Sequence, residues 1–172
     1  MTKKARILLI VIIIAAVTGA DQISKVIIRN TVEYDQRTSV VKNIVTLTRV
    51  ENTGAFLSLG NKLPRPIYKA LMIVMPLVVL FYILRYLFKT ENISRLNITG
   101  ISLITGGGIG NIIDRIAFGS VTDFLYFDFY VFHTGIVNLA DIAVTTGFFI
   151  LIYELIVNHW HKAETKQEAE QE

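Results

Sequence analysis

The sequence contains four apolar stretches that are each long enough to cross a bilayer, at about residues 7–28, 67–88, 96–118 and 135–157. A helix needs about 20 mostly apolar residues to span the hydrocarbon core. The chain has 172 residues, of which 52% are hydrophobic, and a soluble domain of this size cannot bury so much apolar surface. The sequence therefore predicts an all-α membrane protein with four transmembrane helices.

The segment at residues 30–66, between the first two apolar stretches, is mixed in character. It contains the run VVKNIVTLTRVEN, which is typical of β-strands, followed by the turn-prone GNKLP at 60–64. We expect a small strand-rich extracytoplasmic cap from it. A second segment, SVTDFLYFDFYVFHTG, is crowded with Phe and Tyr. These side chains settle at the headgroup level, so we expect this segment to be interfacial.

The basic residues favour a topology with both termini in the cytoplasm. They stand directly before the first apolar stretch and around the short turn between the second and third: Lys3, Lys4, Arg6, Arg85, Lys89 and Arg95. We expect one integral membrane domain over residues 1–160 and a disordered polar tail over 161–172. Residues 1–20 also fit a cleaved signal peptide, but the helical pattern continues without a break to residue 28, which favours a retained span.

Composition excludes several kinds of chemistry. The chain has no cysteine, so disulfides, thiolate metal sites and a cysteine nucleophile are excluded. The three histidines, His133, His159 and His161, are not clustered as a zinc site requires. The net charge is +3, but no aromatic-basic surface motif accompanies the scattered basic residues. We therefore expect membrane lipids and not nucleic acid as partners, and no metal or cofactor.

Charged side chains within or at the ends of the apolar stretches are costly unless they are paired, which makes each a functional candidate. Asp21 and Lys25 are four residues apart on one helical face and predict an ion pair, although a direct role is equally compatible with the pattern. Asp114 adjoins Arg115, and we interpret this neighbour pair as a structural ion pair. Arg115 would alternatively face a lipid phosphate.

Asp123 and Asp141 are the pair that suggests chemistry. They are eighteen residues apart and belong to different elements, so the aromatic segment between them can fold back and bring the carboxyls together. Two carboxyls in one low-dielectric site hold a single proton near neutrality. Such a pair supplies one acid and one base for peptide hydrolysis. Spacing alone leaves two other functions open, namely proton or cation transport and a non-catalytic scaffold.

Five motifs occur in register along the four spans. They are DQISK at 21–25, ENTGAF at 51–56, GGGIGNIIDR at 106–115, GSVTDF at 119–124 and VNLAD at 137–141. Together they resemble the signal peptidase II family, the lipoprotein signal peptidases of bacterial inner membranes. Two departures are mild. Val137 stands where the family commonly has Phe, and residues 57–60 replace a stretch that is often more aromatic.

The resemblance implies an aspartic endopeptidase, without cofactor, that cuts diacylglyceryl-modified prolipoproteins before the lipidated cysteine. It places the two catalytic aspartates at Asp123 and Asp141, at the extracytoplasmic interface of a peptidase that we expect to be monomeric. The alternatives are a small transporter with a polar pathway and a membrane scaffold subunit. The resemblance further implies a set of residues that line or support the substrate site: Asn52, Gly54, Asn111, Arg115 and Asn138.

Overall fold

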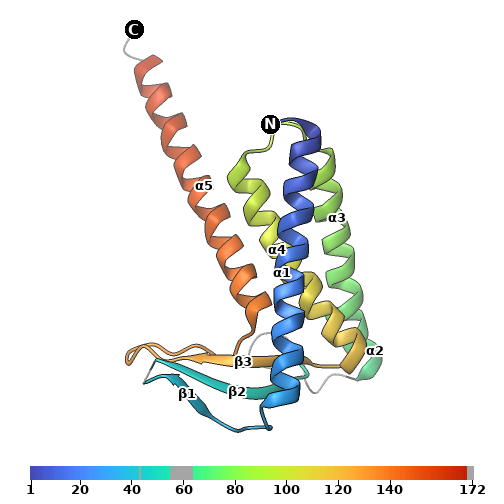
Figure 1. Cartoon of the computed structure of the whole chain (residues 1–172). Coiled ribbons are helices and arrows are strands. Elements are labelled where there is room, and N and C mark those ends of the chain that lie inside the picture. The colour runs from blue at the N-terminus through green and yellow to red at the C-terminus, as the bar shows by residue number, and fades with distance from the viewer. Residues whose placement is uncertain (43, 55–63, 170–172) are drawn as a thin grey trace.

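The computed structural model describes residues 1–42, 44–54 and 64–169 of the chain. Figure 1 shows a helical bundle with a small sheet at one end and both termini at the other. The four apolar stretches are confirmed as helices long and apolar enough to cross a membrane. They are α1 (Lys3–Thr31), a composite second span (Arg65–Lys89), α4 (Arg95–Phe118) and α5 (Leu139–Ala169).

The helix ends carry the capping residues that their sequences supply. The hydroxyl of Thr2 accepts a hydrogen bond from the N–H of Ala5 at the start of α1, and Ser94 does the same for Asn97 at the start of α4. Such side chains satisfy N–H groups that have no partner within the helix. Gly119 ends α4 with φ of 76°, in the left-handed region that glycine adopts without strain.

The second span is not a regular helix. It consists of α2 (Arg65–Lys69), the π-helical turn η2 (Ala70–Val74) and α3 (Met75–Lys89). Pro76 lies within this span and favours a kink, because proline has no N–H and its ring clashes with the carbonyl four residues earlier. The structure places a wide π turn directly before this proline, a local irregularity of the kind that accompanies helix kinks.

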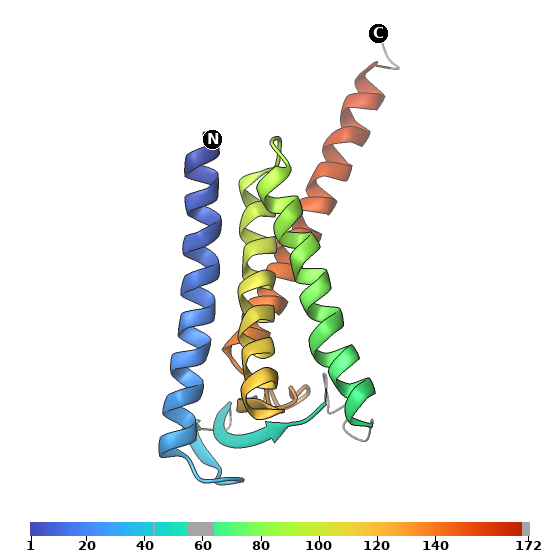
Figure 2. The ribbon, with the colours of Figure 1, turned by 90° about the vertical axis from the view of Figure 1, so that its right-hand side faces the viewer.

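Helix α4 is the centre of the bundle, and its glycines allow close approach of α1 and α5 (Figure 2). A Cβ at Gly107 would collide with the carbonyl of Ala140 on α5, and one at Gly110 would collide with the carboxylate of Asp21 on α1. Small residues are typical of helix contacts in membranes, where packing replaces the hydrophobic effect. The glycine-rich run thus brings the polar residues of three helices together.

The outer faces of the spans are apolar, as lipid contact requires. Large hydrophobic side chains are exposed on each span, among them Ile12 on α1, Val79 on α3, Ile116 on α4 and Leu155 on α5. In a soluble protein, apolar patches of this extent would drive association. Here they form the surface that a bilayer would cover.

The cap contains a three-stranded antiparallel sheet in the order β1-β2-β3. Its strands are β1 (Thr38–Val41), β2 (Val45–Asn52) and β3 (Val121–Phe127). Two strands come from the segment predicted to form the cap. The third comes from the aromatic segment, for which only an interfacial position was predicted. Its β-branched and aromatic residues suit a strand, but the pairing with β2 is long-range. The turn at 60–63 and the departure at 57–60 lie outside the described residues.

Two boundaries of the fourth span differ from the sequence prediction. Helix α5 begins at Leu139 and not near residue 135, because the backbone of Val137 bonds to Leu125 of β3 instead of entering the helix. At the other end α5 continues to Ala169, where the sequence predicted a disordered tail from residue 161. Ala, Glu, Lys and Gln are strong helix formers, and extending an existing helix requires no new nucleus.

The close approach of α4 and α5 predicts that Gly107→Ala destabilises the protein. The added Cβ would meet the Ala140 carbonyl, and overpacking of this kind costs about 1–3 kcal/mol. Gly19→Ala is the matched control, because no atom lies within 4 Å of a Cβ at Gly19. Unfolding temperatures in detergent measure both. Equal unfolding temperatures for the two variants would contradict the packing argument.

Candidate active site

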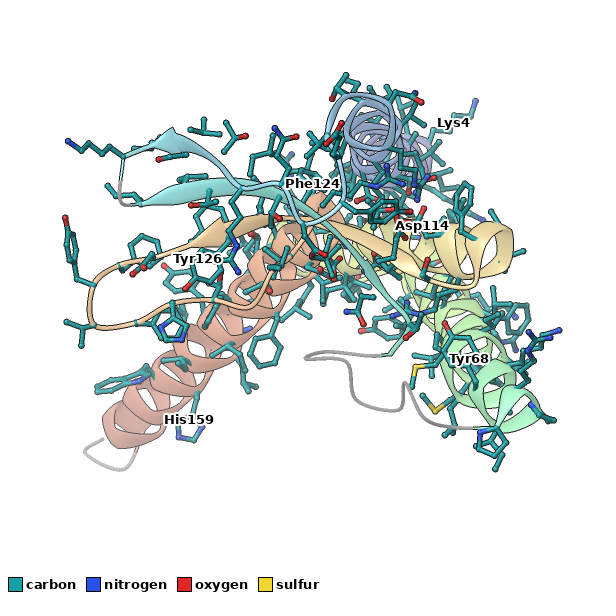
Figure 3. The ribbon with its side chains drawn as sticks, turned by 90° about the horizontal axis from the view of Figure 1, so that it is seen from below. Lys4, Tyr68, Asp114, Phe124, Tyr126 and His159 are labelled. Carbon is teal, nitrogen blue, oxygen red and sulfur yellow. The ribbon has the colours of Figure 1, made fainter. Side chains whose placement is uncertain are left out.

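The candidate site lies where the ends of the helices meet the sheet. β3 supplies Asp123, the first turn of α5 supplies Asp141 and the end of β2 supplies Asn52. Asn111 lies on α4, and Asn138 directly precedes α5. Viewed from the sheet end, Figure 3 shows the labelled Asp114 and Phe124 of this region lying near the end of α1. Residues far apart in sequence therefore gather at one end of the bundle.

The carboxyl group of Asp123 is buried and held by two side-chain amides. Its Oδ1 accepts a hydrogen bond of 2.6 Å from Nδ2 of Asn138, and its Oδ2 accepts one of 3.0 Å from Nδ2 of Asn52. The side chain is placed by strand pairing, since Val50 of β2 lies opposite Asp123. Both oxygens thus have a fixed donor, which orients the carboxyl plane.

Asp141 is held by the start of its own helix. Its Oδ2 accepts from the backbone N–H of Asn138 at 3.2 Å, while its own N–H donates to Oδ1 of Asn138 at 3.0 Å. This reciprocal arrangement is a capping box with Asn at the N-cap and Asp three residues later. The other oxygen, Oδ1, accepts from Nδ2 of Asn111 at 2.8 Å. The local sequence N-L-A-D therefore both starts α5 and fixes the carboxyl.

Two asparagines connect the two carboxyls. Nδ2 of Asn138 donates both to Asp123 and to Oδ1 of Asn111, the latter at 3.1 Å. Asn111 in turn donates to Asp141. The backbone and side chain of Asn138 thus reach both acids. The structure brings together Asp123, Asp141, Asn52, Asn111 and Asn138, as the sequence prediction required.

The environment of Asp123 favours its protonated form. The pKa of Asp123 is raised from 3.8 to about 7, chiefly because burial penalises the charged carboxylate and next because Asp141 is a nearby negative charge. The hydrogen bonds from Asn52 and Asn138 and the positive charge of Lys25 oppose this rise in the pKa. The pair of acids can therefore retain one proton near neutral pH.

Lys25 forms a fully buried ion cluster beside the two acids. Its ammonium lies 2.8 Å from Oδ2 of Asp21 and 3.2 Å from Oδ2 of Asp114, and it donates to Oδ1 of Asn111 at 3.0 Å. The predicted Asp21–Lys25 pair is confirmed. Oδ1 of Asp21 also accepts the backbone N–H of Ala140 in the first turn of α5. One cluster thus joins α1, α4 and α5.

The expected ion pair between Asp114 and Arg115 is wrong. Asp114 pairs instead with Lys25 and with Arg29, whose Nη2 lies 2.9 Å from its Oδ2. Adjacent residues of a helix point about 100° apart, so they rarely face each other. Arg115 turns away and donates to the carbonyl oxygens of Gly54 at 3.2 Å and Asn111 at 3.5 Å.

Gly54 is buried at the edge of the site. Its N–H donates to Oδ1 of Asn52, and its carbonyl accepts from Arg115. Asn52 therefore bonds to its own turn with one side-chain atom and to Asp123 with another. The last two residues of the ENTGAF motif, Ala55 and Phe56, lie outside the described residues.

A polar network that links the bundle to the sheet was not predicted from the sequence. Arg29 donates to the hydroxyl of Thr122, which donates to Glu51, and Gln22 bonds to both Asp21 and Asp114. Arg29 follows Asp21 and Lys25 at intervals of four residues, and this helical spacing was a usable signal. Glu51 carried no comparable signal, because the hydroxyl groups that donate to it, from Ser120 and Thr122, are 69 and 71 residues away in the chain.

The described residues contain no group of three or more His, Asp or Glu side chains that could hold a metal ion. The chemistry that this geometry offers is that of two hydrogen-bonded carboxyls beside a buried cation.

Comparison with known proteins gives a consistent result. A family model described as signal peptidase (SPase) II matches residues 13–157. A lipoprotein signal peptidase of Burkholderia cenocepacia (strain HI2424) is 37% identical over 137 residues, which cover 78% of this chain and 79% of that protein. One from Wigglesworthia glossinidia brevipalpis is 37% identical over 112 residues, which cover 64% of this chain and 70% of that protein.

Solved structures share the fold. A bacterial membrane enzyme determined by the in meso method at 2.3 Å resolution superposes with a TM-score of 0.80 at 24% identity, covering 89% of this chain and 90% of that one. A second, at 1.9 Å resolution, gives a TM-score of 0.74 at 26% identity, covering 85% and 91%. The arrangement of four spans and a sheet is therefore also found in bacterial membrane enzymes.

The buried cluster predicts that Lys25→Met strongly destabilises the protein. Removing the ammonium leaves Asp21 and Asp114 without their shared cation, and breaking a buried ion pair costs about 3–5 kcal/mol. The unfolding temperature in detergent measures this loss. Lys4→Met is the control, because Lys4 is exposed near the start of the same helix. An unfolding temperature for Lys25→Met equal to that of the control would refute the anchoring role.

Proposed function

This chain belongs to the signal peptidase II family and is a protease that removes signal peptides from prolipoproteins, and we propose that it does so as an aspartic endopeptidase. In this proposal Asp123 and Asp141 are the catalytic residues, and the bond before the diacylglyceryl-modified cysteine is cut. The observation that carries the proposal is the pair of carboxyls, of which Asp123 is buried, held by three asparagine side chains.

The pair acts as one base and one acid. The ionised carboxyl accepts a proton from water as the water oxygen bonds to the scissile carbonyl carbon, and the protonated carboxyl donates to the developing oxyanion. The carbon–nitrogen bond then breaks, and the leaving amine takes a proton from the pair. The asparagines keep both carboxyls in a fixed orientation during these transfers, which reduces the reorganisation that the reaction requires.

An apolar groove supports a membrane-embedded substrate. It has a volume of about 490 Å³ and lies between α3, α4 and α5, where Val78, Ile83, Ile104 and Leu151 contribute to its lining. Such a surface suits acyl chains, which have no polar groups to satisfy. We assign the groove to the diacylglyceryl chains of the substrate. Asn52, Gly54 and Arg115 then support the peptide near the acids, where the small Gly54 permits close backbone approach.

The charges favour a topology with the catalytic end on the extracytoplasmic side of the bacterial inner membrane. Both termini lie at the end opposite the sheet (Figure 1). At that end Arg6 donates to the carbonyl oxygens of Phe88, Thr90 and Glu91, so the basic start of α1 lies beside the turn that follows α3. Basic residues concentrate on the cytoplasmic side of membrane proteins. A cytoplasmic position for both termini follows.

An ion pathway is disfavoured by the distribution of charge along the spans. The sequence has no Asp, Glu, Lys, Arg or His at 7–20, 70–84, 96–113 or 142–153. The buried cluster around Lys25 therefore has no ionisable continuation through the middle of the bundle, as a proton or cation path would require. A catalytic site at one interface accounts for this one-sided clustering.

The proposal predicts that Asp123→Asn and Asp141→Asn each abolish cleavage, with a fall in kcat of about 10³-fold or more, since either change removes one half of the acid–base pair. The measurement is cleavage of a diacylglyceryl-modified prolipoprotein by the purified chain in detergent. Asp128→Asn is the control, because Asp128 follows β3 and its side chain, among the described residues, accepts only the local hydrogen bond from the N–H of Tyr130.

Unlipidated prolipoprotein serves as a second control and should not be cut. Unfolding temperatures near that of the wild type establish that the two variants are folded. If a folded Asp123→Asn protein cleaves at the wild-type rate, the acid–base pair is ruled out. If the wild-type chain is folded and cuts neither substrate, the peptidase assignment itself fails.

The raised pKa of Asp123, about 7, predicts a loss of activity as pH rises above that value. Above pH 7 the pair loses its shared proton, both carboxyls are ionised and no acid is present to protonate the leaving amine. Asn52→Ala should move this alkaline limb to higher pH, because the amide of Asn52 lowers the pKa of Asp123.

The profile of kcat/KM against pH provides the test. Asn97→Ala is the matched control, since Asn97 lies in the first turn of α4 at the opposite end of the bundle, and it should leave the limb in place. A limb that Asn52→Ala leaves unchanged or moves to lower pH would contradict the assignment.

A further inference from the structure

A second cavity is lined in part by Arg115, whose guanidinium also donates to the carbonyl of Gly54 at the edge of the candidate active site. It has a volume of about 470 Å³ and is lined by residues from the start of the second span, the end of α4 and the end of β2. Figure 3 shows Tyr68, one of its lining residues, on the second span, beyond α4 and away from α1. The volume is in the range of small-molecule sites.

The cavity is strongly cationic. Arg65, Lys69 and Arg115 all line it. Within the described residues, none of these three side chains lies within ion-pair distance of a carboxylate. Among the described residues, Arg115 donates hydrogen bonds only to carbonyl oxygens, and its buried Nε–H has no acceptor there. Three like charges repel one another, so an anion placed among them is stabilised.

Local structure brings the three cations around the same cavity. Arg65 and Lys69 are four residues apart and share a helical face. Tyr68 lies between them in sequence, and its hydroxyl donates to the carbonyl of Gly119 at 2.9 Å. That bond ties the start of the second span to the end of α4. A guanidinium fork is well shaped for two oxygens of a phosphate.

The lipid part of the substrate does not account for these charges, and Arg65 and Lys69 have no role in the proposed cleavage. A diacylglyceryl thioether contains ester and thioether groups and carries no charge, so it has no group for three cations to bind. The carboxyls of the active site accept hydrogen bonds from their own asparagines, and among the described residues none of the three cavity cations forms an ion pair with them. The cavity therefore suits a ligand other than the lipid that is attached to the cleaved protein.

The surroundings of the cavity identify the kind of anion. Ile73 adds an apolar wall, and the next turns of the same span expose Leu71, Val74 and Met75 on the lipid-facing surface. An anionic head within the cavity would thus continue into apolar chains along the helix. Tyr68 at this depth is typical of the headgroup region.

We propose that the cavity formed by Arg65, Lys69 and Arg115 binds the phosphodiester of an anionic glycerophospholipid from the surrounding membrane. The lipid binds apart from the apolar groove that we assign to the diacylglyceryl chains, and it is not consumed by the reaction. Its binding does not depend on which residues cleave the peptide, so this proposal and the proposed function can fail separately.

The test measures binding of phosphatidylglycerol to the full chain in a non-ionic detergent, from the rise in unfolding temperature as lipid is added and from bound lipid counted by native mass spectrometry. Arg65→Gln/Lys69→Gln should weaken binding by about tenfold or more, because two charge-assisted contacts are lost. Both side chains are exposed, so the lipid-free unfolding temperature should stay at the wild-type value.

Arg85→Gln/Lys89→Gln is the matched control. It removes the same charge from the other end of the same span, where both side chains are also exposed, and it should bind phosphatidylglycerol as the wild type does. Inorganic phosphate and diacylglycerol are tested in parallel, and each should bind far more weakly than the phospholipid. Wild-type affinity in the Arg65/Lys69 variant, or equally tight binding of either fragment, overturns the proposal.

Discussion

The structure depends on one buried charge, the ammonium of Lys25. It has no exposure to solvent and is surrounded by Asp21, Asp114 and the side-chain oxygen of Asn111. A buried cation without such partners would cost several kcal/mol. The requirement to surround it fixes α1 against α4, and the bond from Ala140 to Asp21 adds the start of α5. The register of three helices is therefore set by the same few polar contacts.

The same ammonium orients the candidate active site. Because Lys25 donates to Oδ1 of Asn111, the amide nitrogen of Asn111 is left to donate to Asp141. The opposite orientation of that amide would place two donors face to face at Lys25 and two acceptors face to face at Asp141. Stability and chemistry therefore share one network, so a change at Lys25 acts on the fold and on the charge near Asp123 together.

The sequence predicted the features that depend on residues close together in the chain. The four spans follow from length and hydropathy, and the Asp21–Lys25 pair follows from its spacing of four residues. The partners of Asp114 did not follow, because they depend on how α1 packs against α4 through the glycines. β3 was not predicted, since its pairing with β2 joins residues about 70 apart in the chain. The candidate site residues were predicted from motifs, and their mutual contacts could be seen only in the fold.

Strand register explains why the two acids meet. Val137 exchanges backbone hydrogen bonds with Leu125 of β3, and its carbonyl also accepts the N–H of Phe124. The next residue, Asn138, is the N-cap of α5, so the helix that carries Asp141 begins at a fixed place beside β3. Asp123 itself is oriented by the pairing of β3 with β2, and a slip of one residue there would turn its side chain to the opposite face of the sheet. The sheet of the cap therefore positions the carboxyl of Asp123. The carboxyl of Asp141 is positioned by the start of α5 and by Asn111 of α4.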